Sequence, residues 1–394
     1  MIRTLDDLAA DGTAVGVRVD INSPLAADGA LADDSRLRAH VDTLDELLAR
    51  DARVALLAHQ GRPGDDDFTT LEAHADRLDE LLDHPVDYLD ATFSAAARRR
   101  IGDLAPGSMV VLENTRFYSE EYMEFDPAVA ADTYLVQGLA PALDAYVNDA
   151  FAAAHRSQPS LVGFPEVVPG YAGRVMEAEL DALGDIGSSP TPRVYALGGA
   201  KVDDAVDVAA SVLGSGLADA VLTSGVVGNA FLHVTGTDLG GPTLEVVRER
   251  GGESLARAED LYEEYGDRIY LPEDVAVERD SERIEVPVED LPVEHPAMDV
   301  GSRTVSTYAE IFEDAGTAVL NGPAGVFEED MFATGTRELY RAARAAEFTV
   351  VGGGDTAAAL RSLGLSGFDH VSTGGGAALA MLTGEALPAV DALE

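Results

Sequence analysis

Short apolar, β-branched runs alternate with longer helical patterns along almost the whole chain of 394 residues. These runs are expected to be strands and fall at residues 15–21, 53–59, 109–112, 145–148, 193–197, 220–223, 269–271, 317–320 and 348–351. Helical patterns such as 37–48 and 205–214 separate them. Strands that alternate with helices build βαβ units and mostly parallel sheets. The sequence therefore predicts an α/β protein.

The strands fall into two series, and 394 residues exceed the length of an ordinary single domain. We therefore predict two doubly wound domains with mostly parallel sheets, at residues 1–168 and 169–375. A helix within 169–185 is expected to join them, and the tail, 376–394, to return toward the first domain. The acidic, proline-interrupted segment 278–295 is interpreted as a surface excursion.

The chain carries 71 Asp and Glu residues against 27 Lys and Arg residues, a formal net charge of −44. Nucleic acids and anionic membrane surfaces bind basic patches, so we expect neither as a partner. A large net charge also keeps proteins soluble and monomeric, and it repels itself unless salt screens it. Since about 1 M salt shortens the screening length to roughly 3 Å, the composition predicts a monomer adapted to a salt-rich cytosol.

No apolar run reaches the roughly 18 residues that a transmembrane helix needs. Acidic residues interrupt the N-terminal positions, where a signal peptide requires an uninterrupted apolar stretch. We therefore expect a cytoplasmic protein. The chain has no Cys, which excludes disulfides and thiolate chemistry.

Glycine-rich loops follow predicted strands of the second half, at residues 197–201, 224–229, 321–328, 352–356 and 373–377. Glycine lets the backbone approach a ligand closely, and a helix that starts at such a loop offers its N-terminus to an anion. Five such loops favour a nucleotide site over tight turns alone. Asp355 is then either a helix N-cap or a ligand of nucleotide-borne Mg²⁺. The Walker A and Gly-x-Gly-x-x-Gly motifs are absent, which indicates a phosphate site of another design.

Lys201, in the loop 197–201, is the only lysine of the chain. It is either a surface lysine that has survived or an ammonium group that the site requires. Its place beside two glycines, at the end of an apolar strand, favours the second interpretation.

The predicted strand ends of the first half carry basic side chains instead, namely Arg18, Arg36, His59, Arg62, Arg116, His155 and Arg156. The planar guanidinium group suits phosphate and carboxylate. We therefore expect an anionic small molecule here, the alternative being that each arginine pairs with a local acid. No Ser-His-Asp spacing supplies a covalent nucleophile. An anion pocket and a nucleotide site suit direct phosphoryl transfer, which depends on positioning and charge neutralisation.

These segments resemble phosphoglycerate kinases, and the resemblance runs nearly from end to end of the chain. The motifs that carry it lie in family order at residues 17–25, 58–63, 112–117, 147–151, 154–156, 197–202, 320–328, 352–356 and 370–376. The acidic composition and the sequence at 156–160 resemble the halophilic archaeal branch. The resemblance implies reversible transfer from 1,3-bisphosphoglycerate to MgADP, giving 3-phosphoglycerate and MgATP in glycolysis and gluconeogenesis.

The resemblance also implies roles for individual residues. The 3-phosphoglycerate site, on the first domain, maps onto Asp20, Asn22, Arg36, His59, Arg62, Arg116 and Arg156. The nucleotide site, on the second domain, maps onto Lys201, Asn321, Glu328, Gly353, Gly354, Asp355 and Thr356, with Asp355 on the Mg²⁺. The groups implied to act on the transferring phosphoryl are Arg36, Lys201, Gly374 and Gly375. Because the ligands belong to different domains, a hinge closure before in-line transfer is implied.

One departure from the family pattern concerns the nucleotide phosphates. Ala205 stands where many members carry a second lysine, which removes an expected contact. Two alternatives to a phosphoglycerate kinase stay open from the residues themselves. The chain is either another small-acid kinase of the same architecture or a non-catalytic protein that binds an anion and a nucleotide.

Overall fold

The computed structural model describes residues 2–27, 29–184 and 186–394. The described chain divides into two compact units. Unit 1 comprises residues 1–181 together with 386–394, and unit 2 comprises residues 182–385. Each unit is built on its own six-stranded sheet, and every pairing within the two sheets is parallel. The α/β prediction with two doubly wound domains is therefore confirmed.

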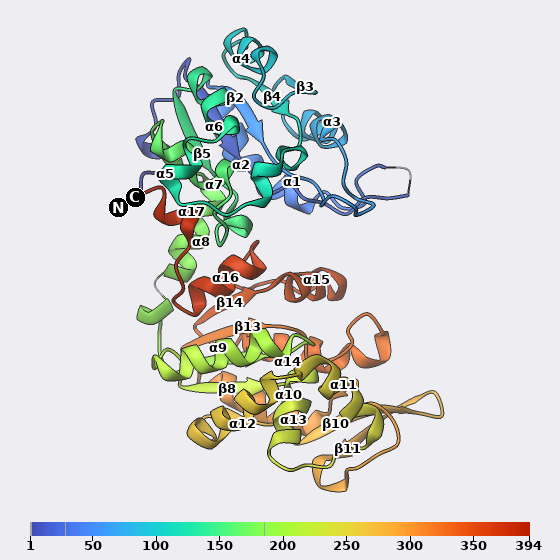
Figure 1. Ribbon diagram of the computed structural model, residues 1–394. Coiled ribbons are helices and arrows are strands. Elements are labelled where there is room, and N and C mark those ends of the chain that lie inside the picture. Colours follow the sequence, from blue (N-terminus) through green and yellow to red (C-terminus); the bar gives the residue numbers. More distant parts are fainter. Residues whose placement is uncertain (1, 28, 185) are drawn as a thin grey trace. The chain divides into compact units, whose positions relative to one another are not determined.

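Unit 1 carries its strands in the order β3-β4-β2-β1-β5-β6. The strands are β1 (Ala14–Arg18), β2 (Arg53–Leu57), β3 (Val86–Leu89), β4 (Ser108–Leu112), β5 (Ala145–Asn148) and β6 (Gly170–Ala172). The helices are α1 (Ser35–Ala39), α2 (Val41–Ala49), α3 (Glu72–Leu81), α4 (Ala95–Gly102), α5 (Pro127–Ala130), α6 (Tyr134–Leu139), α7 (Pro159–Val162), α8 (Arg174–Gly184) and α17 (Pro388–Asp391). Helix α3 packs against β3, and α4 packs against β2 and β4 (Figure 1).

Unit 2 carries its large sheet in the order β15-β14-β13-β7-β8-β9. The strands are β7 (Arg193–Leu197), β8 (Ala220–Thr223), β9 (Ile269–Tyr270), β13 (Thr317–Asn321), β14 (Phe348–Gly352) and β15 (His370–Val371). A small antiparallel sheet consists of β10 (Asp274–Arg279), β11 (Glu282–Pro287) and β12 (Asp299–Val300). The helices are α9 (Val202–Gly214), α10 (Gly225–Val234), α11 (Gly241–Gly251), α12 (Ser254–Tyr265), α13 (Ser302–Glu313), α14 (Thr334–Ala343), α15 (Gly354–Leu363) and α16 (Gly375–Leu382).

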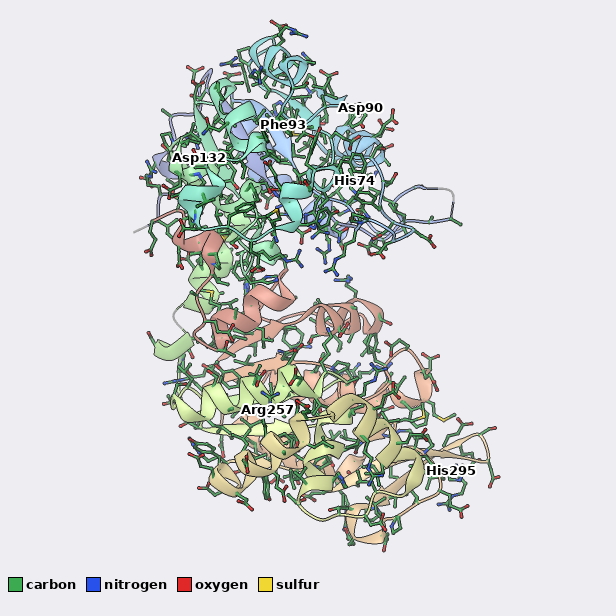
Figure 2. The ribbon with its side chains drawn as sticks, in the orientation of Figure 1. His74, Asp90, Phe93, Asp132, Arg257 and His295 are labelled. Carbon is green, nitrogen blue, oxygen red and sulfur yellow. The ribbon has the colours of Figure 1, made fainter. Side chains whose placement is uncertain are left out.

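Charged contacts also join the helices of unit 2. Arg257, labelled in Figure 2, comes from α12 and pairs with Asp203 and Asp207 on α9. Among the described residues, no helix is both long enough and apolar enough to cross a membrane.

The unit boundaries differ from the expected domain ranges, 1–168, 169–375 and 376–394. The chain passes from unit 1 to unit 2 at residue 181, within α8, because the start of this helix is anchored in unit 1: Arg174 pairs with Glu46 of α2 and with Asp6. The chain returns to unit 1 at residue 386 rather than 376, because α16 packs against α9 and β14. Helix α17 then packs on α7 of unit 1 (Figure 1).

Two predicted segments take a different local structure. The helix expected over 37–48 is two helices, α1 and α2, which meet at His40 (φ −95°, ψ −3°), whose side chain is engaged elsewhere. The expected surface excursion 278–295 contains most of the β10–β11 hairpin. Its turn residues, Asp280 and Ser281, both have positive φ, as a tight hairpin turn requires.

Candidate active site

The basic side chains of unit 1 gather at the carboxyl ends of its central strands. Strand β1 lies between β2 and β5, so the chain order reverses around it. In open parallel sheets, ligands bind outside the carboxyl ends of strands at such a reversal. Asp20 follows β1, His59 follows β2 and Arg116 follows β4. This set is mostly basic, and we call it the acid cluster after the acid ligand that it is expected to bind. Its members are Asp20, Asn22, Arg36, His59, Arg62, Arg116 and Arg156.

Asp20 and His59 form the buried base of the acid cluster. Asp20 Oδ2 accepts a hydrogen bond of 2.5 Å from Arg36, and His59 Nδ1 lies 2.8 Å from the Arg18 guanidinium. Burial and the charge of Arg18 hold the pKa of His59 well below its usual range. Burial alone would raise the pKa of Asp20, but the charges of His59, Arg36 and Arg18 outweigh it and lower the pKa to about 2. The charge of His59 contributes only at acidic pH, because its own pKa is lowered, whereas the Arg36 and Arg18 guanidinium groups favour the Asp20 carboxylate at neutral pH as well.

The arginines of the acid cluster outnumber its acids. Burial, with the charges of Arg156 and Arg18, lowers the pKa of Arg116 to about 10. Burial also lowers the pKa of Arg156; Asp20 opposes this shift, and Arg62 adds to it. These guanidinium groups repel one another, and a bound anion relieves that repulsion.

Side chains and backbone hold the loop that carries His59 and Arg62. Asn22 Oδ1 accepts from the Gly61 N–H at 2.9 Å, and Arg116 donates to the Gly61 carbonyl at 2.7 Å. Gln60 is fully buried, and its amide donates to the Ser23 carbonyl at 3.0 Å. The loop is therefore fixed in place before any ligand binds.

A second candidate site lies in unit 2, at the carboxyl ends of β7, β13 and β14. Strand β7 lies between β13 and β8, which places the reversal of chain order here. A cavity of about 250 Å³ opens at this point. Its lining includes Lys201, Asn321, Gly353, Asp355 and Gly375. We call it the phosphate pocket.

Three helices begin at the wall of the phosphate pocket. Lys201, Gly353 and Gly374 are the residues that immediately precede α9, α15 and α16. A side-chain carbon added at Gly375 would lie 3.3 Å from the Gly354 nitrogen, so the first turns of α15 and α16 approach each other closely. Helix N-termini present unpaired N–H groups and a partial positive charge, and they bind phosphate.

Gly353 fixes the geometry of the pocket floor. Its φ of +93° and ψ of 139° form a conformation that glycine alone adopts without strain. A side-chain carbon at this position would lie 2.8 Å from Asn321 Oδ1 and 3.1 Å from Thr356 Oγ1. Thr356 is itself buried and accepts a hydrogen bond of 2.7 Å from the Gly322 N–H. The loop therefore has room for backbone only.

Lys201 and Asp355 face each other across the phosphate pocket. Lys201 Nζ lies 3.2 Å from Asp355 Oδ2, and 70% and 65% of the two side chains are exposed. An exposed pair of this kind contributes little stability, so both groups are available to a ligand. Ala205 lies on α9 at the same pocket and is buried, with Asp204 beside it. The second lysine of the family pattern is thus replaced by a small side chain next to an acid.

The residues present suit Mg²⁺ that arrives with a nucleotide. Among the described residues, no group of three or more His, Asp or Glu side chains is arranged to hold a metal by itself. Mg²⁺ typically takes one or two carboxylates together with phosphate oxygens. Asp355 supplies one carboxylate beside the helix N-termini that suit the phosphates.

A more apolar cavity of about 290 Å³ adjoins the phosphate pocket and shares Gly199, Ala200, Pro323 and Asp355 with it. Val226, Met298 and Phe327 supply apolar surface, and Glu328 also lines this cavity. An apolar slot beside a phosphate pocket suits the nucleoside part of a nucleotide.

The structure brings most of the predicted residues together within their own units. The acid cluster assembles in unit 1, and Lys201, Asn321, Gly353, Gly354, Asp355, Thr356 and Gly375 line the phosphate pocket. Glu328 lines the adjoining cavity instead, and Gly374 precedes α16 without lining either. Arg18 is among the basic side chains expected near an anion but is not mapped onto the family's ligand set, and it lies buried against His59 and Ser160. The available signal was an arginine at the end of an otherwise apolar strand.

Comparisons with known proteins agree on one family. The family model described as phosphoglycerate kinase matches residues 5–385. A phosphoglycerate kinase of Natronomonas pharaonis is 69% identical over the full length of both chains. That of Halobacterium salinarum is 65% identical, over all of this chain and 99% of its own.

Two solved structures are similar to this chain in their three-dimensional fold as well. The crystal structure of phosphoglycerate kinase from Pyrococcus horikoshii superposes with a TM-score of 0.93 at 41% identity, covering 100% of this chain and 98% of that one. The structure of the Coxiella burnetii phosphoglycerate kinase gives a TM-score of 0.84 at 30% identity, with 100% and 99% covered.

Proposed function

Since the chain belongs to the phosphoglycerate kinase family, we propose that its two sites divide the family's reaction between them. The chain is an enzyme that transfers a phosphoryl group reversibly between 1,3-bisphosphoglycerate and ADP, a step of glycolysis. The sequence-based identification is confirmed, and none of the comparisons favours either alternative, another small-acid kinase or a non-catalytic binding protein. The proposals that follow concern residues, metal and assembly.

The acid cluster is proposed to bind 3-phosphoglycerate. Its arginines, only partly balanced by Asp20, suit a ligand that carries both a carboxylate and a phosphate. Arg36 has 44% of its side chain exposed, so it can leave Asp20 to contact the transferring phosphoryl. The buried and uncharged His59 orients the acid rather than accepting its proton.

The phosphate pocket is proposed to bind the nucleotide phosphates. The N–H groups at the starts of α15 and α16 and the Lys201 ammonium neutralise charge that develops during transfer. Asp355 is proposed to hold Mg²⁺, which supplies charge neutralisation at the phosphates when it is bound. Lys201 would then exchange its pairing with Asp355 for one with a phosphate oxygen.

We further propose that the enzyme acts as a cytoplasmic monomer without nucleic-acid or membrane partners. The support is the net charge of −44, which repels polyanions and other copies of the chain. The in-line geometry of transfer and the hinge closure expected from the sequence remain predictions.

The single observation that carries the site assignment is Lys201, the chain's only lysine, opposite Asp355 in the phosphate pocket. The test is a coupled assay in molar KCl with ATP, Mg²⁺ and 3-phosphoglycerate. We expect turnover by the wild type and a fall in kcat for Lys201→Ala of about 100-fold or more, with 3-phosphoglycerate affinity nearly unchanged. Arg248→Ala, which removes one cation from α11, is the control and should keep wild-type kcat. An equal loss of turnover and of acid affinity in Lys201→Ala would remove this lysine from the transferring phosphoryl.

A further inference from the structure

Two nearby side chains contact Asp20, one at its carboxylate and the other at its main chain. Arg36, on α1, donates to the Asp20 carboxylate. His40, the residue between α1 and α2, places its Nε2 3.2 Å from both the main-chain N and the main-chain O of Asp20. The buried His40 is thus attached to the backbone of an acid-cluster residue without belonging to the cluster's exposed face.

The other ring nitrogen of His40 contacts a second buried acid. His40 Nδ1 lies 2.7 Å from Oδ2 of Asp149, which directly follows β5 and is fully buried. Asp149 accepts at its other oxygen from backbone N–H groups, so it acts here as an acceptor and Nδ1 of His40 is the donor. In the neutral imidazole, Nε2 then accepts from the Asp20 N–H. One histidine therefore bridges the Asp149 carboxylate and the main chain of Asp20.

Asp149 caps the start of α8, the helix in which the chain passes from unit 1 to unit 2. Its Oδ1 accepts from the Val175 N–H at 2.9 Å and the Met176 N–H at 3.4 Å, two of the N–H groups that the helix leaves unpaired. The residue before the helix, Gly173, has no side chain to do this. A carbon added there would lie 2.2 Å from Asp149 Oδ1, so glycine makes room for the remote cap.

A second contact ties the same helix end to α2. The Arg174 N–H donates to Thr43 Oγ1 at 3.0 Å, and the Arg174 guanidinium pairs with Glu46. The first N–H groups of α8 are therefore satisfied by side chains from elsewhere in unit 1. Their order depends on the position of α2, whose first residue directly follows His40.

We propose that His40 and Asp149 are positioning residues that couple occupancy of the acid cluster to the order of the first turn of α8. A ligand that restrains Asp20 restrains His40, and His40 in turn restrains the carboxylate that caps α8. By linkage, an ordered cap must strengthen acid binding by the same factor. The inference rests on the proposed binding of 3-phosphoglycerate at the acid cluster, and its test separates the two.

The test measures amide hydrogen exchange with and without saturating 3-phosphoglycerate in molar KCl. Residues 173–178 report the cap, since the Val175 and Met176 N–H groups are its donors. Residues 18–22 and 59–62 report occupancy of the acid cluster itself. In the wild type we expect 3-phosphoglycerate to slow exchange in all three segments, by about fivefold or more at the cap.

Two substitutions of His40 cut the bridge at different ends. The amide of His40→Asn reaches the place of Nδ1 and keeps the Asp149 contact, whereas that of His40→Gln reaches the place of Nε2 and keeps the Asp20 contact. Both should lose the ligand-induced slowing at 173–178 while retaining it at 18–22 and 59–62. His233→Asn is the control, because His233 lies on α10 of unit 2 and takes no part in these contacts. If one of the two variants does not fold, the other still tests the coupling.

Each outcome of the experiment decides a different claim. Ligand-induced protection of 173–178 that persists in both His40 variants would overturn the coupling. Wild-type protection at 18–22 and 59–62 without any at 173–178 would also overturn it, and would leave the acid site standing. No protection at 18–22 and 59–62 would instead reject the proposed 3-phosphoglycerate site.

Discussion

Gly353→Ala tests whether the floor of the phosphate pocket is as constrained as its geometry indicates. At φ +93° and ψ 139°, an alanine is strained by about 1–3 kcal/mol. Its methyl group would also lie 2.8 Å from Asn321 Oδ1 and 3.1 Å from Thr356 Oγ1. Overpacking of this kind costs about 1–3 kcal/mol, since Thr356 is buried and held by the Gly322 N–H. The free energy of unfolding should therefore fall by about 2–6 kcal/mol, and nucleotide affinity should fall with it.

The measurement is urea unfolding in molar KCl, followed by circular dichroism, together with the KM for MgATP. Urea is uncharged and leaves the salt concentration constant through the titration. Gly354→Ala is the matched control, because a methyl group there meets no atom within 4 Å and the residue begins α15. It should keep wild-type stability, or gain up to about 1 kcal/mol as a better helix former. A Gly353→Ala protein as stable as Gly354→Ala would refute the reasoning.

Three further predictions follow from unit 1 and from the surface charge. Arg116→Ala should raise the KM for 3-phosphoglycerate by about 10- to 100-fold, with kcat less affected. The control, Arg99→Ala on α4, should leave this KM unchanged. An unchanged KM in Arg116→Ala would take Arg116 out of the site. Burial lowers the pKa of His74 from 6.5 to about 4. As the pH falls, His74 therefore takes up its proton in the unfolded chain before it does so in the folded one. The free energy of unfolding that is present above pH 6.5 should decline by about 3 kcal/mol toward pH 4. His74→Gln should lack that part of the decline in pH-dependent unfolding, and matching curves would exclude the assignment. Dialysis from molar KCl to near-zero salt should abolish much of the circular dichroism signal, whereas an unchanged spectrum would contradict the salt dependence.

The acid sensitivity of His74 has a local cause. His74, labelled in Figure 2, comes from α3, and its Nε2 lies 3.0 Å from Gln60 Oε1. Gln60 Oε1 accepts, so Nε2 carries the proton of the neutral ring. A second proton would have to bind Nδ1, which is buried. His59 also resists protonation, so the comparison with His74→Gln, rather than the wild-type curve alone, isolates this residue.

The central strands could be predicted from sequence because burial on both faces makes them continuous apolar runs. The bounds of β5, β7 and β8 agree with the prediction to the residue. The edge strands β3 and β15 were missed, because half-buried positions break their apolar pattern. The antiparallel strands β10 and β11 were missed because charged residues flank the short apolar run 275–277 of β10 and interrupt the apolar residues of β11.

The site residues were predictable where a residue type and a loop coincide, and not where a contact spans the sequence. Gly353 and Asp355 stand in a glycine loop after an apolar strand, a pattern that is visible locally. His40 and Asp149 are 109 residues apart, and nothing near either one indicates the other. The predicted helix over 37–48 is divided at this same residue, His40, whose side chain contacts both Asp149 and the main chain of Asp20.

The distribution of the two cation types follows the shapes of their ligands. The acid cluster uses arginine, whose planar fork matches a carboxylate or phosphate that stays bound in one place. The phosphate pocket is lined by the backbone of Gly353, Gly354 and Gly375, which leaves donors fixed and space narrow. A compact ammonium such as that of Lys201 fits there and can turn from Asp355 to a phosphate oxygen without a planar constraint. Lysine was dispensable over the rest of this acidic chain, and it persists at the one place where a guanidinium would not serve as well.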